Sequence, residues 1–536
     1  MIDVQALSVR YPGREAPTVR HADLHVAPGE LVLVSGPTGC GKSTLLNAIN
    51  GVLAHESDAE ISGEVKVDGR DVSALPLHAL CRLVGSVFQS PDSQLCTAIP
   101  ETEVAFGLEN MAVERPAMHR RIAHALDTVG LAHCREQPTA TLSGGQKQRL
   151  AIACALALEP KALLLDEPIS QLDPEGAAEI LALIARLKDA HDRAVLVIEH
   201  RIEDVAALAD RIVIMAEGRL VSDRPRPAAF QDLGPLRRLG LAIPHLPDLF
   251  ERLGRTERPL TAQEAPDIQT RRPLPERTRE GATPAPVGTV RGLQFRYGRH
   301  APCVLESVDL DLHRGDRLAL MGPNGSGKST LLHVLAGMLR PSAGAVEWEG
   351  GARPPLGLVV QQPDLMLFQE TVRDEVEFAP RHLGLGPPAR ADVVGAVLAR
   401  MGIQDLADEA PFALSRGQRL RTAVGSVLSM RPRVLLLDEP TTGQDRDQIE
   451  RMMDGLSADV DLVVFCTHDV DTVARHANRV VLLANGQVIA DGPPRQVLFD
   501  QERMRAASIR PTSAQAYARR LGVQALQVDE LLEVLS

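Results

Sequence analysis

The chain has 536 residues, of which 24% are charged, and a formal net charge of −12. A chain of this length is long enough for about three or four domains with substantial hydrophobic cores. The negative net charge argues against a protein that coats nucleic acid. No apolar run approaches the roughly 18 residues that span a bilayer, so any membrane role depends on partner chains. The first residues show no secretory signal. Seven cysteines without paired spacing indicate free thiols in a reducing cytosol.

A glycine-rich loop follows the apolar run 31–34, leads into a helical pattern and occurs again after the run 318–321. In such a strand–loop–helix unit, backbone N–H groups close around phosphate oxygens at the positive end of a helix. The lysine suits the β- and γ-phosphates, and the following serine suits Mg²⁺. We predict two phosphate-binding loops, formed by Gly36, Pro37, Thr38, Gly39, Cys40, Gly41, Lys42, Ser43 and Thr44, and by Gly322, Pro323, Asn324, Gly325, Ser326, Gly327, Lys328, Ser329 and Thr330.

Other motifs recur in step with these loops, which predicts two copies of one domain. Tyr11 precedes the first loop lysine by the same interval as Tyr297 precedes the second. A glutamine, a Leu-Ser-x-Gly-Gln stretch and an apolar run ending in Asp-Glu all recur at one common offset, and a histidine follows at nearly the same one. That common offset is shorter than the offset between the loops, which places a short deletion in the second copy. It falls between phosphate loop and glutamine, where the first copy is expected to carry peripheral strands and turns.

The Asp-Glu pairs follow apolar strands, so we expect them at the C-terminal edge of a parallel sheet, where open α/β folds keep their sites. The aspartate would hold the Mg²⁺ sphere, the glutamate would orient or deprotonate water, the histidine could contact the γ-phosphate, and the tyrosine could stack on adenine. Alone, each has a simpler interpretation as a helix cap, a core histidine or a packed ring. The predicted catalytic residues are Glu167, Glu439, His200, His468, Gln89 and Gln361, and the predicted metal ligands are Ser43, Gln89, Asp166, Ser329, Gln361 and Asp438.

The Leu-Ser-Gly-Gly-Gln stretch at 142–146 is a donor-rich turn at a helix start, suited to a γ-phosphate presented by another domain. With the phosphate loops and Asp-Glu motifs, it makes about four-fifths of the chain resemble an ABC-type ATPase. The resemblance implies an α/β fold with two tandem P-loop ABC ATPase domains, each with a helical subdomain. It also implies ATP and Mg²⁺ as ligands, with the two copies docked head to tail so that each ATP lies between one copy's loop and the other's signature. It adds ATP contacts at Ser143, Gly144, Gly145, Gln146, Ser415, Gly417 and Gln418.

One signature departs from the pattern, because Arg416 replaces its first glycine. The side chain would either obstruct close approach of the backbone or add a charge near phosphate. Because both copies keep the glutamate and the histidine, neither site is predicted to be inactive.

The predicted ABC domains cover residues 1–222 and 288–498. Residues 223–287 would combine a small helical appendage with a Pro-rich linker, and residues 499–536 would form a second appendage. This repeat depends on two Arg-Leu-Gly triplets, at 252–254 and 520–522, which recur at the same offset as the two histidines. The alternative is two unrelated surface helices.

Residues 84–95, 103–110 and 199–204 resemble the ATPase subunits of energy-coupling factor transporters, which import vitamins, vitamin precursors or metal ions in prokaryotes. The resemblance implies a peripheral protein at the cytoplasmic face of the cell membrane. Its partners would be a transmembrane coupling protein and a membrane-embedded substrate-binding subunit. Segments 90–110 and 362–379 would receive helices of the coupling protein, with Glu103 as a groove charge, and the appendages would help hold the ATPase domains together.

Two other classes stay open. A fused sugar-importer ATPase shares these motifs. A soluble ABC protein acting on ribosomes or DNA does too, but translation-type members tend to have a long charged helical linker, whereas this linker is broken by prolines. DNA-repair members carry zinc-type cysteine pairs, which this sequence lacks. We therefore expect no nucleic-acid partner.

Overall fold

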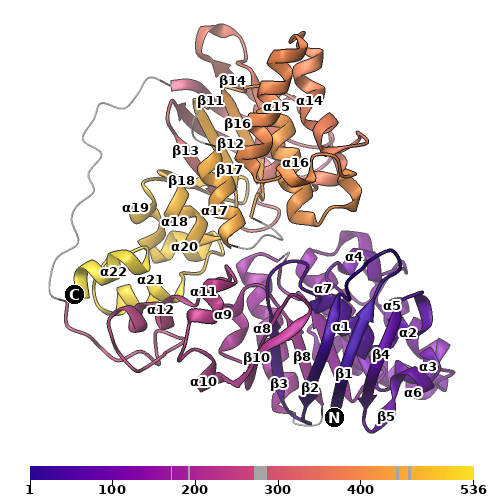
Figure 1. Cartoon of the computed structure of the whole chain (residues 1–536). Coiled ribbons are helices and arrows are strands. Elements are labelled where there is room, and N and C mark those ends of the chain that lie inside the picture. The colour runs from indigo at the N-terminus through magenta and orange to yellow at the C-terminus, as the bar shows by residue number, and fades with distance from the viewer. Residues whose placement is uncertain (171, 191–192, 271–285, 442–445, 457–459, 536) are drawn as a thin grey trace. The chain divides into compact units, whose positions relative to one another are not determined.

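The chain divides into two compact units, Met1–Leu260 and Thr261–Ser536 (Figure 1). The computed structural model describes every residue except 171, 191–192, 271–285, 442–445, 457–459 and 536. Residues 271–285, in the later part of the predicted appendage and Pro-rich linker (223–287), therefore lie outside the described residues. No helix in the described ranges is long and apolar enough to cross a membrane.

The first unit mixes strands and helices along the chain. Its strands are β1 (Ile2–Arg10), β2 (Val19–Val26), β3 (Leu31–Ser35), β4 (Glu60–Val67), β5 (Arg70–Asp71), β6 (Val84–Val87), β7 (Ala162–Asp166), β8 (Ala194–Ile198), β9 (Arg211–Ala216) and β10 (Arg219–Pro225). Its helices are α1 (Lys42–Ile49), α2 (Val52–Glu56), α3 (Leu77–Leu80), α4 (Pro91–Gln94), α5 (Pro100–Asn110), α6 (Arg115–Thr128), α7 (Gly144–Ala157), α8 (Pro174–Asp189), α9 (Ile202–Ala206), α10 (Arg226–Ala229), α11 (Gly234–Arg238) and α12 (His245–Arg252).

The second unit repeats this order with fewer peripheral elements. Its strands are β11 (Pro286–Phe295), β12 (Leu305–His313), β13 (Arg317–Met321), β14 (Ala343–Trp348), β15 (Leu356–Val359), β16 (Val434–Asp438), β17 (Leu462–Cys466), β18 (Arg479–Ala484) and β19 (Gln487–Gly492). Its helices are α13 (Lys328–Leu335), α14 (Val372–His382), α15 (Pro387–Met401), α16 (Arg416–Leu428), α17 (Arg446–Gly455), α18 (Val470–His476), α19 (Pro494–Phe499), α20 (Gln501–Ala506), α21 (Ser513–Arg520) and α22 (Val528–Leu535).

Each unit is built on a six-stranded sheet with the same strand order. The order is β6-β7-β8-β3-β9-β10 in the first unit and β15-β16-β17-β13-β18-β19 in the second, and only the last strand runs antiparallel to its neighbour. The central strands are continuous apolar runs buried on both faces, as expected for parallel strands covered on two sides. The predicted α/β fold is thus confirmed.

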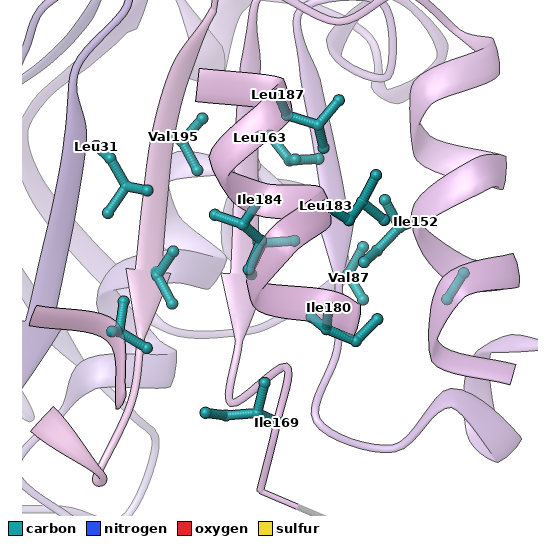
Figure 2. Packing of buried hydrophobic residues seen from close by; sticks show 14 of the residues in the cluster. Leu31, Val87, Ile152, Leu163, Ile169, Ile180, Leu183, Ile184, Leu187 and Val195 are labelled. Carbon is teal, nitrogen blue, oxygen red and sulfur yellow. The ribbon is translucent and has the colours of Figure 1, made fainter. Parts of the chain in front are cut away.

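The two faces of the first unit's six-stranded sheet contribute side chains to two separate hydrophobic cores. Val32 and Val34 pack with α1 and the antiparallel sheet β2-β1-β4-β5, whereas Leu31 and Leu33 face the core that contains α7 and α8. Helix α8 shows why this packing forms: Asp173 caps its N-terminus, and one face carries the apolar residues Ile180, Leu183, Ile184 and Leu187. That face lies against the strands in Figure 2, as an i, i+3, i+4, i+7 pattern requires.

The deletion in the second copy falls on peripheral elements, as expected. Between the phosphate loop and β6 the first unit has α2, β4, β5 and α3, whereas the second passes from α13 through β14 to β15. Each unit also has a helical subdomain, in which α5 and α6 pack on α7 and α14 and α15 pack on α16.

Helices also follow each ATPase-like body. Helix α12 (His245–Arg252) and helix α21 (Ser513–Arg520) have the same length and begin at corresponding positions of the repeat. In the first unit Leu236, Leu241 and Leu260 join the main core. In the second unit, Tyr517 donates a 2.8 Å hydrogen bond to the Pro266 carbonyl, so the first residues of this unit pack on α21.

Candidate nucleotide sites

Both phosphate loops place a lysine at the start of a helix. Gly41 and Gly327 have φ of 108° and 101°, a conformation that favours glycine, and the next residues, Lys42 and Lys328, begin α1 and α13. The buried Lys42 ammonium donates to the carbonyls of Gly36 (2.8 Å) and Pro37 (3.0 Å); Lys328 makes the same two bonds in its own loop. Each lysine ammonium group therefore lies against the backbone of its own loop, where a bound phosphate would contact it.

The glycine that opens the first loop has no room for a side chain. A Cβ at Gly36 would lie 2.0 Å from the Met215 carbonyl oxygen of β9. The corresponding distance at Gly322 is 1.9 Å, to Leu483 of β18. These close approaches fix each loop between its own strand and the neighbouring one.

Asp166 and Asp438 end β7 and β16, each of which is separated by one strand from the strand that precedes its phosphate loop. Burial and neighbouring Glu167 raise the pKa of Asp166 to about 6, although the Ser43 hydroxyl and Lys42 oppose this. Burial likewise raises the pKa of Asp438. The Oδ1 atom of each aspartate is buried and accepts no hydrogen bond from the described residues. Because buried carboxylate oxygens need a donor or a cation, the aspartates fit Mg²⁺, with Ser43 and Ser329 beside them.

In the first unit, the predicted catalytic residues meet around Glu167. His200 Nε2 lies 2.9 Å from Glu167 Oε1, and the Gln89 amide donates a 2.7 Å hydrogen bond to Oε2. Burial raises the pKa of Glu167, but His200, Lys42 and Gln89 together hold it below its usual value. Glu167 also has φ of 49°, a left-handed conformation that costs a non-glycine residue about 1–3 kcal/mol. A carboxylate that is ionised at neutral pH suits a water-orienting base.

The second unit repeats only part of this cluster. His468 Nε2 lies 3.0 Å from Glu439 Oε1, and Glu439 has φ of 52°. Gln361 is exposed, however, and within the described part of the chain it makes no hydrogen bond to Glu439. The structure thus brings glutamate and histidine together twice and glutamine and glutamate once.

Both signature stretches are helix N-termini closed by a capping box. Ser143 Oγ accepts the Gln146 N–H, and Gln146 Oε1 accepts the Ser143 N–H at 2.8 Å. Ser415 and Gln418 form the same pair. Arg416 is the first residue of α16 and leaves this cap unchanged. The following N–H groups point out of the helix start, as an anion site requires.

The two tyrosines lie beside their phosphate loops. The Tyr11 hydroxyl is 3.4 Å from Thr44 Oγ1, and the Tyr297 hydroxyl is 3.1 Å from Thr330 Oγ1. Tyr297 is exposed and packs edge-on against Phe295. The exposed ring is therefore accessible to a planar ligand.

Sequence reasoning gave the wrong surroundings for Glu103. Its side chain is buried, and its carboxylate accepts the N–H groups of Cys96 (3.0 Å) and Thr97 (2.5 Å) rather than facing a groove. Glu375 holds Phe368 and Gln369 in the same way. These carboxylates fix the loops that follow the glutamines. Their repetition at the same offset was the one signal that could have separated them from surface charges.

Sequence reasoning assigned no role to Glu199, although this residue lies in the stretch 199–204 that carries part of the resemblance. This carboxyl is completely buried, and burial together with the Glu167 charge raises its pKa to about 8. Glu199 directly follows an apolar strand, and this position in the sequence is the signal that could have indicated a buried carboxyl group.

These features define a protein with two P-loop ATPase domains of one design. The ABC transporter family model matches residues 19–170 and 305–442, more than half of the chain. A Methanosarcina mazei protein provisionally named as an ABC transporter ATP-binding protein is 41% identical, with 100% of this chain and 96% of that protein aligned. A Streptomyces avermitilis protein with the same name is 38% identical over 93% of this chain and 95% of its own. The chain therefore belongs to the ABC transporter family, and its ABC ATPase domains imply ATP binding and hydrolysis.

Among solved structures, cbiO1 from Clostridium perfringens, described as part of the ABC transporter complex cbiONQ, is similar to one part of the chain. It is 31% identical, covers 47% of this chain and 98% of its own, and has a TM-score of 0.40.

Proposed function

We propose that this chain is the ATP-hydrolysing, energy-coupling subunit of an energy-coupling factor importer for a vitamin, a vitamin precursor or a metal ion. It would act at the cytoplasmic face of the membrane through a transmembrane coupling protein and a membrane-embedded substrate-binding subunit. The observation that carries the proposal is a set of exposed apolar side chains on the segments after the two glutamines. Phe106, Leu365 and Phe368 are exposed there. Large apolar groups at the surface are typical of partner contacts.

Buried carboxylates hold the loops next to these side chains in place, which supports a docking role. Glu103 holds the backbone at Cys96 and Thr97, and Glu375 holds it at Phe368 and Gln369. In the first unit, the same loop begins at Gln89, which contacts Glu167. A partner that moved this segment would therefore change the surroundings of the proposed base.

The chemistry follows from the residues at each sheet edge. Lys42 and the loop N–H groups would bind the phosphates, and Ser43 and Asp166 would hold Mg²⁺, which neutralises charge on the phosphates. Glu167, oriented by His200 and Gln89, would accept a proton from the attacking water. Lys328, Ser329, Asp438, Glu439 and His468 have the same roles in the second unit. The signatures Ser143–Gln146 and Ser415–Gln418 would supply N–H donors to the ATP bound by the opposite copy, so ATP would favour closure through these differential contacts.

The docking claim is tested with charge placed on the exposed apolar side chains. Phe106→Asp and Leu365→Asp should release the chain from detergent-solubilised coupling protein while leaving ATP affinity unchanged. Each has a matched control: Val221→Asp, since Val221 is 52% exposed against 50% for Phe106, and Met338→Asp, since Met338 is 67% exposed against 77% for Leu365. Equal loss of complex with the control variants, or none with the test variants, would contradict docking at these segments.

A further inference from the structure

Glu199 joins the two loops that carry Glu167 and His200. Its Oε1 accepts the Ile169 N–H at 3.1 Å, and its Oε2 accepts the His200 N–H at 3.2 Å. Figure 2 shows the Ile169 side chain in the turn beyond the strand, where it belongs to the hydrophobic core. One buried carboxyl therefore fixes the backbone on both sides of the Glu167–His200 contact.

The turn that Glu199 holds is strained. Glu167 has φ of 49°, and such a conformation persists only where the surrounding structure enforces it. The Glu167 N–H donates to the Ile198 carbonyl at 2.9 Å, which fixes one end of the turn. The bond from Ile169 to Glu199 fixes the other end. Without it, the backbone after Glu167 has a buried N–H with no acceptor, a loss of the kind that is unfavourable in a protein interior.

The second unit connects the corresponding two loops through different residues. Thr467 stands at the position of Glu199, before His468, and Thr441 stands at the position of Ile169, two residues after Glu439. Their hydroxyl oxygens lie 3.0 Å apart and join the same two loops. The Glu–His distance is nearly the same in both units, 2.9 and 3.0 Å. The pairs Ile169–Glu199 and Thr441–Thr467 are therefore two versions of one connection.

We propose that Glu199 is a positioning residue for ATP hydrolysis in the first unit. It acts through the Ile169 and His200 backbones to hold Glu167 where this carboxylate can take a proton from the attacking water. The inference rests on the proposed function only in assigning that step to Glu167. It gives the first unit a connection that depends on a carboxyl group, whereas the second unit uses two hydroxyls.

The chain offers its own control, because the second unit's pair can be transplanted into the first. Glu199→Thr alone removes the acceptor for the Ile169 N–H. Ile169→Thr with Glu199→Thr rebuilds the hydroxyl pair seen in the second unit, but it also replaces a core isoleucine. The double variant should therefore be less stable than the single variant and yet more active. A purely structural role predicts the opposite, with activity following stability.

The measurements are kcat and KM for ATP on the purified full-length variants, together with urea unfolding. We expect Glu199→Thr to lower kcat by up to about half with KM unchanged. A displacement of about 1 Å can slow a catalytic step about hundredfold at the affected site, whereas the second unit's site is left intact. The double variant should recover most of the loss. Glu199→Gln, which keeps an acceptor for Ile169, should retain more activity than Glu199→Thr.

Three results would overturn the role of Glu199: a wild-type kcat in Glu199→Thr, a loss confined to KM, or a double variant no more active than the single one. A wild-type chain that hydrolyses no ATP would instead contradict the proposed function. If the Glu199→Thr chain fails to fold, the test uses Glu199→Gln and the double variant Ile169→Thr with Glu199→Thr. Inactivity of both of these variants would also overturn the proposal.

Discussion

Gln89 donates a 2.7 Å hydrogen bond to Glu167, so the loop that begins at Gln89 touches the proposed base of the first site. Gln361 is exposed in the second unit. In the first unit, one side-chain hydrogen bond therefore connects the segment expected to contact a membrane partner with the proposed catalytic carboxylate. This contact gives a direct physical route by which a partner could change the hydrolysis rate.

Removing both proposed bases should stop turnover without preventing ATP binding. Glu167→Gln with Glu439→Gln should lower the hydrolysis rate about 10²–10⁴-fold, since a positioned base contributes about that much. A fluorescent ATP analogue should still bind and should dissociate more slowly than from the wild type. Glu217→Gln is the matched control, because Glu217 also has positive φ, 48°, but lies exposed in a turn. Wild-type hydrolysis by the double variant would show that the base is another group.

The two sites should contribute unequally because of Arg416. The capping box of Ser415 and Gln418 matches that of Ser143 and Gln146, so a difference between the two signatures comes from the arginine side chain and not from a distorted helix start. A preorganised donor at developing charge is worth about 3–4 kcal/mol. We expect Glu439→Gln to lower turnover more than Glu167→Gln, and Arg416→Gly to narrow that gap. Steady-state rates in the assembled transporter decide this, and equal losses from the two single variants would show that both signatures work equally well.

Glu103 should matter for the loop it holds and not for nucleotide. Each hydrogen bond to a charged group is worth about 1.5–3 kcal/mol, and its carboxylate accepts two backbone bonds. Glu103→Gln should lower the free energy of unfolding and weaken partner association, with ATP affinity unchanged. The exposed Glu109→Gln, on the same helix α5, is the control. An unchanged urea midpoint for Glu103→Gln would contradict this role.

The buried Glu199 makes stability depend on pH in a defined direction. Its pKa is raised from 4.5 to about 8 in the folded chain, mainly by burial and then by Glu167, with Asp204 adding to the shift and Arg201 opposing it. Folded chain therefore keeps a proton that unfolded chain releases between about pH 4.5 and 8, and the free energy of unfolding falls as pH rises through this window.

Glu199→Gln has no such proton. Its stability relative to the wild type should therefore rise by up to about 4 kcal/mol between pH 5 and 8.5. Urea unfolding at the two pH values measures the difference. A constant difference between the two chains would mean that Glu199 has an ordinary pKa in the folded state.

Local patterns were enough to predict the α/β fold, and they also singled out the residues that the structure gathers at each sheet edge. Lys42, Asp166 and Glu167 lie directly after strands or at a helix start, so their places follow from the chain's own order. Glu199 and Glu103 were different, because each acts on backbone N–H groups of other segments that no motif identifies. The contrast between Gln89 and Gln361 was also invisible, since both follow similar apolar runs. Contacts of this kind depend on tertiary packing.

The central claim is that this ATPase drives a membrane importer, and purification from membranes tests it most directly. The tagged wild-type chain and its Phe106→Asp variant would be isolated in detergent from the native membrane fraction, and the co-purifying proteins quantified by mass spectrometry. We predict a multi-span coupling protein and a small membrane-embedded binding protein in fixed ratio with the wild type, both lost with the variant. Recovery of ribosomal or DNA-bound proteins, or of a sugar permease in their place, would contradict the account.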